Sequence, residues 1–404
     1  MKFIDGSITA AQGFSASGVH VGIRKNKGKK DLALIYCETL CDAAAVYTMN
    51  AVKGAPLKVT KKHLENGKAR AILCNSGNAN TCAANGEKLA EDCCDIVAKC
   101  TGVDSTDVIV ASTGVIGQTL SLEPFESGIP VAAKKLSKDG STDAAEAIMT
   151  TDTVKKQFAV EFEIGGKICR LGGIAKGSGM IAPNMATLLV FVTTDVNISS
   201  EMLHKAISED VKTSFNMVCI DGDTSTNDML TVMASGLAGN ERITSEGEDF
   251  DKFKNALKAV TTSLCKLIAT DGEGASKLIE CTVEGAKDYE SARKMCKAII
   301  SSNLFKAAIF GADANWGRVL CAAGYSGAEA DFEKAKVEFK SQSGEIVVCL
   351  DGAGLEFDED LAKKILTEKE IEVILTLKDG NGKCQGWGCD LTYDYVKING
   401  DYRT

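Results

Sequence analysis

A glycine-rich segment leads directly into an apolar one: Gly172-Gly173-Ile174-Ala175-Lys176-Gly177-Ser178-Gly179-Met180-Ile181-Ala182-Pro183-Asn184-Met185-Ala186-Thr187, then Leu188-Leu189-Val190-Phe191-Val192. Glycine permits tight backbone paths and proline restricts φ, so the first part predicts an irregular loop. The second part is a continuous apolar run, which is typical of a strand buried on both faces. The sequence therefore predicts a loop that ends directly at the start of a buried strand.

This loop has three interpretations. A phosphate-binding loop requires Gly-Lys followed by Ser or Thr at the start of a helix, whereas here the order is Lys176-Gly177-Ser178 and a strand follows. A purely structural turn is the simplest interpretation of an isolated glycine-rich loop. The third interpretation is a site at which the chain cuts itself between Ala186 and Thr187.

Self-cleavage would give Thr187 the base that its hydroxyl lacks. A threonine hydroxyl is a poor nucleophile unless a base lies beside it, and cutting the bond after Ala186 would create a free α-amino group on Thr187. Such an amine has a pKa of about 8, so a useful fraction is unprotonated at neutral pH. Threonine activated by its own terminal amine is an established arrangement. The spacing of residues alone leaves the three interpretations open.

Helices and strands alternate on both sides of this segment. The predicted elements are helices at 86–100, 250–268 and 289–301, a hairpin at 337–350 that turns at Ser343-Gly344, and strands at 371–377 and 391–398. We therefore expect an α/β fold with layered sheets and helices, in which the strands of the first half and the strand after Thr187 share one sheet. A smaller C-terminal α+β domain follows. The expected domains are 1–195, 196–283 and 284–404.

Composition narrows the class of protein. The 404 residues are 45% hydrophobic and 25% charged, the proportions of an ordinary globular protein. The net charge of −9 argues against a general nucleic-acid binder, which usually shows a basic face. The first residues lack the apolar stretch of a signal peptide, and no run of about 18 apolar residues occurs anywhere. We expect a cytoplasmic protein that does not span a membrane.

Sixteen cysteines and three histidines do not form a metal-binding pattern. The cysteines are scattered from Cys37 to Cys389 without a C-x-x-C pair, and the histidines lie far apart in sequence. Structural zinc and iron–sulfur sites usually show tighter paired spacings. We expect reduced thiols, many of them small core residues.

The run Lys176–Leu189 resembles the cleavage segment of the ornithine acetyltransferase family, whose precursor cuts itself before a threonine. Further segments match that family in order along the chain: 13–19, 75–80, 111–117, 148–153, 216–228, 270–274, 311–318 and 395–404. Each match alone is modest, but together they cover essentially the whole chain. The resemblance implies a self-cleaving N-terminal-threonine acetyltransferase fold.

The resemblance also implies what Thr187 does. Its hydroxyl attacks the Ala186 carbonyl and the resulting ester hydrolyses, which cuts the chain. The same hydroxyl then takes the acetyl group of N-acetylornithine, ornithine leaves, and glutamate accepts the acetyl group from acetyl-Thr187. Such a two-step exchange in arginine biosynthesis should follow ping-pong kinetics.

Other residues are assigned by the same resemblance. The hydroxyl of Thr113 and the backbone N–H of Gly114 are the expected donors to the tetrahedral oxyanion. The expected substrate contacts, besides Thr187 itself, are Thr150, Lys176, Glu273, Asn399 and Thr404. Neighbouring Thr151 leaves the first of these open by one position. The last two imply that the tail folds over the active site, although termini are usually loose. The segment 311–318 receives no role.

The family implies two fragments per precursor, assembled as a heterotetramer, and no metal or organic cofactor. Whether acetyl-CoA also serves as acetyl donor is left open by the sequence. Two rival hypotheses remain. A related self-cleaving aminopeptidase or amidase would share the nucleophile but pass the acyl group to water. A non-enzymatic binding protein would stay one intact chain and would be unaffected by a change at Thr187.

Overall fold

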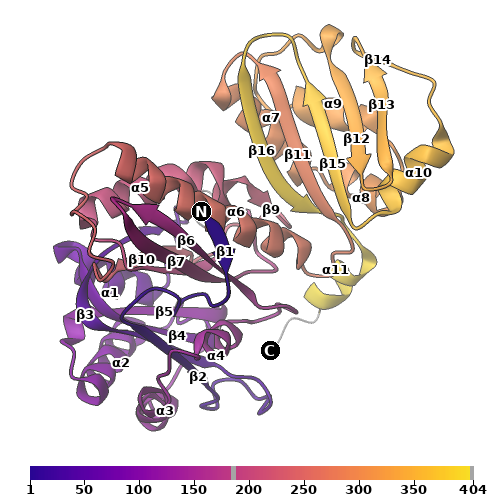
Figure 1. Ribbon diagram of the computed structural model, residues 1–404. Coiled ribbons are helices and arrows are strands. Elements are labelled where there is room, and N and C mark those ends of the chain that lie inside the picture. The colour runs from indigo at the N-terminus through magenta and orange to yellow at the C-terminus, as the bar shows by residue number, and fades with distance from the viewer. Residues whose placement is uncertain (183–187, 401–404) are drawn as a thin grey trace.

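The chain forms two lobes, each built on one sheet (Figure 1). The computed structural model describes residues 1–182 and 188–400, so the predicted residues Ala186, Thr187 and Thr404 lie outside the described residues. The first lobe runs from indigo to magenta in Figure 1, and the second from orange to yellow. Within these two ranges, no helix is both long and apolar enough to cross a membrane.

The first sheet surrounds the predicted buried strand. Its strands are β1 (Lys2–Ile4), β2 (Phe14–Val19), β3 (Leu32–Tyr47), β4 (Lys68–Asn78), β5 (Val108–Val115), β6 (Lys156–Ile164), β7 (Lys167–Lys176), β8 (Leu189–Thr194) and β10 (Met229–Ala234). They follow the order β1-β6-β7-β8-β10-β3-β4-β5, and β2 pairs with β3. Strand β8 lies antiparallel to β7 and parallel to β10, and all its residues are buried. This confirms the prediction that the strand after Thr187 shares one sheet with the strands that precede it.

Helices cover the sheets, and three of them confirm the predicted ones. They are α1 (Ala55–His63), α2 (Gly86–Thr101), α3 (Glu123–Lys134), α4 (Ser141–Ala147), α5 (Ser200–Thr213), α6 (Glu248–Thr270), α7 (Tyr289–Ser301), α8 (Asn303–Phe310), α9 (Trp316–Gly324), α10 (Glu359–Thr367) and α11 (Tyr393–Asn399). Short 3-10 turns are η1 (Leu64–Asn66), η2 (Ser105–Asp107), η3 (Phe215–Met217) and η4 (Phe332–Lys334). Helices α2, α6 and α7 fall where the apolar periodicity predicts them.

The alternation of side chains along β8 places it between two apolar layers. Val190 and Val192 pack in the same core cluster as the buried faces of α5 and α6. Phe191 points to the other face, into a second cluster that includes residues of α4 and the strands β3 to β5. Both faces are therefore covered, which is why an uninterrupted apolar run is needed here.

The second sheet continues the same core. Its order is β14 (Ala353–Gly354), β13 (Gly344–Leu350), β12 (Lys336–Ser341), β15 (Glu370–Thr376), β11 (Leu278–Ala286), β16 (Gly382–Cys389) and β9 (Val218–Cys219). Helix α6 packs on β6 and β7 of the first sheet and also contacts β16. One apolar cluster, which includes Val260 of α6 and Trp387 of β16, therefore joins the lobes.

Two expectations for the C-terminal region are wrong. The predicted strand at 391–398 is instead helix α11, because the hydroxyl of Thr392 accepts a hydrogen bond from Asp394 N and caps the helix. The strand in this region is β16, whose glycines and cysteines give little strand signal. The hairpin pairs Ser341 with Gly344, so its two-residue turn is Gln342-Ser343, one position before the predicted turn.

Candidate active site

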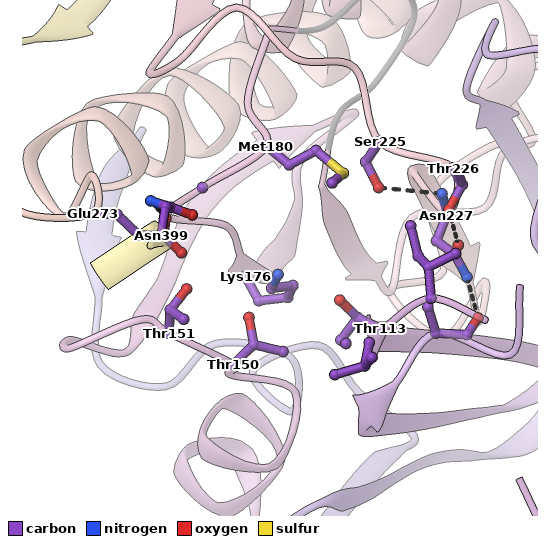
Figure 2. Close-up of a pocket in the computed structure, with 15 residues that line it drawn as sticks. Thr113, Thr150, Thr151, Lys176, Met180, Ser225, Thr226, Asn227, Glu273 and Asn399 are labelled. Atoms are coloured by element: carbon purple, nitrogen blue, oxygen red, sulfur yellow. Dashed lines mark hydrogen bonds between the residues drawn. The ribbon is translucent and has the colours of Figure 1, made fainter. Parts of the chain in front are cut away.

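Six predicted site residues line a single cavity of about 340 Å³ at one end of the first sheet. They are Thr113, Gly114, Thr150, Lys176, Glu273 and Asn399. These residues come from the end of β5, the loop after α4, the end of β7, the loop after α6 and the last turn of α11. Figure 2 shows Thr113, Thr150 and Lys176 around one space, with Glu273 and Asn399 side by side across it. The fold therefore brings together residues that are far apart in sequence.

The described chain resumes beside this cavity. Leu188 and Leu189 line a smaller cavity that shares Thr113 and Lys176 with the first. The backbone of Leu188 is held there, because Met229 N donates to its carbonyl oxygen at 2.9 Å. Consecutive Cα atoms are about 3.8 Å apart, so Thr187 is bonded to a residue in the wall of the site.

The backbone at the end of β5, where Thr113 and Gly114 lie, accepts only glycine at the second of these positions. Gly114 has a φ of 132°, and a Cβ placed on it would lie 2.3 Å from the backbone carbon of Gly77. The side-chain amide of Asn227 fixes the backbone just before these residues, because it donates to Ala79 O at 2.6 Å and to Ser112 O at 3.0 Å. Backbone geometry at the end of β5 is thus fixed on two sides.

The loop that carries Thr150 and Thr151 is anchored by backbone contacts. Arg24 donates to Met149 O at 2.8 Å and to Thr150 O at 2.9 Å. Both threonines line the cavity, and the hydroxyl of Thr151 is hydrogen-bonded to that of Ser178 at 2.6 Å. Arg24 therefore supports the site although it is not among the predicted site residues.

A buried ion cluster ties three walls of the cavity together. Lys156 is fully buried, and its Nζ lies 2.8 Å from Asp152 Oδ1 and 2.5 Å from Asp271 Oδ2. Asp152 also accepts hydrogen bonds from the backbone N–H groups of Thr150 and Gly177, at 2.9 and 2.7 Å. Burial alone would raise the pKa of Asp152, but the charges of Lys156 and Lys176 hold it well below its usual range.

This cluster is not among the predicted site residues, although its two aspartates lie in matched segments. Asp152 follows Thr151, and Asp271 precedes Glu273 by two residues. Only the fold shows that Lys156 joins them, because a pairing of side chains 115 positions apart leaves no periodic signal.

The Glu273 wall is formed by the last helix of the described chain. Asn399 Nδ2 donates to Glu273 Oε2 at 2.7 Å, and the hydroxyl of Thr392 donates to Gly274 O at 2.6 Å. Gly179 completes the packing, since a Cβ there would lie 2.3 Å from Glu273 Oε2. Helix α11 is thereby docked on the loop that carries Glu273.

The glycine-rich loop is held up to the limit of its described part. Asp221 accepts hydrogen bonds from Met180 N at 2.6 Å and from Ile181 N at 2.8 Å. Met180 has a positive φ of 57°, a conformation that non-glycine residues adopt only when neighbours enforce it. Asp221 is a further residue that sequence reasoning did not assign.

Known proteins resemble this chain along its whole length. The model of the ArgJ family matches residues 15–404. The arginine biosynthesis bifunctional protein ArgJ of Caldanaerobacter subterraneus subsp. tengcongensis is 51% identical, with 100% of both chains covered. The protein of the same name from Thermotoga neapolitana is 49% identical, over 97% of this chain and 99% of the other.

A crystal structure of the arginine biosynthesis bifunctional protein ArgJ from Bacillus halodurans is similar with a TM-score of 0.50 and 47% identity. The match covers 52% of this chain and 97% of that polypeptide, so the crystallised polypeptide is itself about half as long as this chain. From its sequence, and from the family model that covers nearly all of it, the chain belongs to the ArgJ family.

Proposed function

We propose that this chain is an acetyltransferase of arginine biosynthesis that moves an acetyl group from N-acetylornithine to glutamate by way of acetyl-Thr187. One observation carries the proposal. Thr113, Gly114, Lys176, Glu273 and Asn399, contributed by four separate segments, line one cavity. Leu188 and Leu189, which follow Thr187, line the smaller cavity that shares Thr113 and Lys176 with it. The names of the relatives, arginine biosynthesis bifunctional proteins, agree with this pathway.

The first reaction is the cleavage of the chain itself. The hydroxyl of Thr187 attacks the carbonyl carbon of Ala186, the bond to the Thr187 nitrogen breaks, and water hydrolyses the ester. Fragments 1–186 and 187–404 result, and Thr187 gains the amine that serves as its base. The half-length of the crystallised relative supports a cut near the middle of the chain.

Acetyl transfer then uses the same hydroxyl twice. N-acetylornithine acetylates Thr187 and ornithine leaves; the amine of glutamate next attacks acetyl-Thr187. Both steps pass through a tetrahedral oxyanion, for which Thr113 and Gly114 are the proposed donors. One such donor is worth roughly 3–4 kcal/mol of transition-state stabilisation in related acyl transfers.

Opposite charges on two walls suit amino-acid substrates. Lys176 and Glu273 are both largely buried and lie on different sides of the cavity. The ammonium of Lys176 pairs with a carboxylate of the substrate, and the carboxylate of Glu273 pairs with an ammonium of ornithine. Thr150, Asn399 and Thr404 are the remaining proposed contacts, with Thr404 outside the described residues.

The proposed reaction needs no metal or organic cofactor, because a hydroxyl, an amine and hydrogen-bond donors supply all of its steps. Acetyl-CoA is a proposed second donor, in line with the word bifunctional in the names of the relatives. The proposed assembly is a heterotetramer of two pairs of fragments.

The test follows the acetyl group in the purified enzyme. With N-acetylornithine alone, we expect one ornithine released per site and one acetyl group added to fragment 187–404, measured by denaturing mass spectrometry. Adding glutamate should remove that acetyl group and yield acetylglutamate. Continuous release of acetate without glutamate would instead identify a hydrolase, and no acetylation at all would contradict the proposal.

A further inference from the structure

Asp228 is a buried acid that nothing above uses. It precedes β10, and only 2% of it is exposed. It lines the smaller cavity together with Thr113, Lys176 and Leu188. The parallel register of β8 and β10 pairs Met229 with Leu189, so Asp228 lies level with Leu188, the neighbour of Thr187.

One carboxyl oxygen of Asp228 is unpaired among the described residues. Its Oδ2 has no hydrogen-bond partner within the described part of the chain. Two other buried aspartates have a hydrogen-bond donor for each carboxyl oxygen. Asp210 accepts from the hydroxyls of Ser214 and Thr261, and Asp195 accepts from the backbone N–H groups of Arg170 and Gln12. A buried polar atom without a partner destabilises a fold, so its presence level with Leu188, the residue bonded to Thr187, calls for a chemical explanation.

The surroundings of Asp228 favour its neutral form. Burial raises the pKa of this carboxyl well above its usual range, and Ser225 and Lys176 oppose the rise only in part. Among the described residues that line the smaller cavity, Lys176 is the other charged side chain. A neutral carboxyl retains a proton that it can donate.

We propose that Asp228 is the proton donor for cleavage of the chain before Thr187, an assignment that rests on the proposed function. As the hydroxyl oxygen of Thr187 bonds to the carbonyl carbon of Ala186, the bond from that carbon to the Thr187 nitrogen breaks. The Asp228 carboxyl gives its proton to the departing nitrogen. The carboxylate that remains takes up the proton of the hydroxyl, and water then hydrolyses the ester.

The experiment measures cleavage of the full precursor. Wild type, Asp228→Asn and the matched control Asp210→Asn are made by cell-free synthesis, and fragments 1–186 and 187–404 are followed over time on denaturing gels. Positioned general acids contribute roughly 100- to 10,000-fold, so Asp228→Asn should cleave at least about 100-fold more slowly than wild type. Asp210 lies on α5, away from the cavity, and its variant should cleave at the wild-type rate.

The pH dependence separates a proton donor from a structural residue. Because the neutral carboxyl is the active form, the ratio of the wild-type rate to the Asp228→Asn rate should fall as pH rises. In an uncleavable Thr187→Ala background, Asp228→Asn should unfold at the same temperature as its parent or a higher one at neutral pH, since folding no longer has to protonate a carboxyl that is ionised in the unfolded chain. A structural role predicts a lower unfolding temperature.

The outcomes are distinguishable. Asp228→Asn cleaving as fast as wild type overturns the role of Asp228 but leaves the proposed function standing. Wild type that stays intact overturns the proposed function itself. If Asp228→Asn fails to fold, the pH dependence of cleavage is measured on the wild-type precursor instead. A cleavage rate that rises without a plateau from pH 5 to 9 overturns the role of Asp228. A cleavage rate that falls at high pH supports it.

Discussion

One wall of the cavity is built from the edge of a buried sheet, whereas the opposite wall depends on an exposed helix near the end of the chain. Thr113 and Lys176 are buried at strand ends, and the Asp152–Lys156–Asp271 cluster fixes the loops beside them. Asn399 is exposed and meets Glu273 from the last turn of α11. The difference teaches that one wall is fixed by buried strand ends and an ion cluster, whereas the other is completed by a surface element.

Removing the centre of the buried cluster should have the largest effect on stability. Lys156→Met leaves Asp152 and Asp271 as neighbouring buried carboxylates without their cation, which costs about 3–5 kcal/mol. The free energy of unfolding from urea titration measures this. The control is Lys252→Met, which removes exposed ion pairs with Glu248 and Asp249 and should leave the free energy of unfolding close to that of wild type. Equal losses in the free energy of unfolding for the two variants would show that the cluster does not stabilise this wall.

Thr113, the proposed oxyanion donor on the buried wall, should matter for both reactions. Thr113→Val keeps the shape of the side chain but removes the hydroxyl, and both chain cleavage and kcat should fall roughly 100- to 1,000-fold. Thr231→Val is a matched control, because the Thr231 hydroxyl is buried on β10 without a partner among the described residues. A Thr113→Val enzyme with normal kcat would remove this residue from the chemistry.

A smaller effect is expected on the exposed wall. Asn399→Ala removes the hydrogen bond to Glu273, which is worth about 1 kcal/mol at a partly exposed site, so kcat/KM for N-acetylornithine should fall roughly fivefold. Chain cleavage should be unchanged. Lys397→Ala, on the same exposed helix, should leave kcat/KM as it is. Slow cleavage in Asn399→Ala would break the distinction between the two walls.

Local sequence patterns predicted the elements that are regular and apolar. Strand β8 and helices α2, α6 and α7 follow directly from runs or repeats of apolar residues. Helix α11 was mistaken for a strand because its apolar residues are spaced irregularly and its start depends on one threonine cap. Strand β16 was missed because packing of its glycines against Cys296 and Ile300, not strand propensity, defines it.

The residues of the candidate site also fall into two groups, those that local sequence motifs reveal and those that only the fold reveals. Matched segments brought forward Thr113, Lys176, Glu273 and the other cavity residues, since each lies in a short contiguous motif. Lys156 and Asp228 could not be found that way. Lys156 matters through partners 4 and 115 positions away, and Asp228 through a buried carboxyl oxygen that has no partner in the described part of the chain. Burial and pairing exist only in three dimensions.

The most direct measurement is the intact mass of the purified protein under denaturing conditions, beside its Thr187→Ala variant. We predict two masses for wild type, those of fragments 1–186 and 187–404, and a single mass of 404 residues for the variant. A wild-type chain that turns over N-acetylornithine while remaining in one piece would contradict the account, because Thr187 would then lack the amine that activates it.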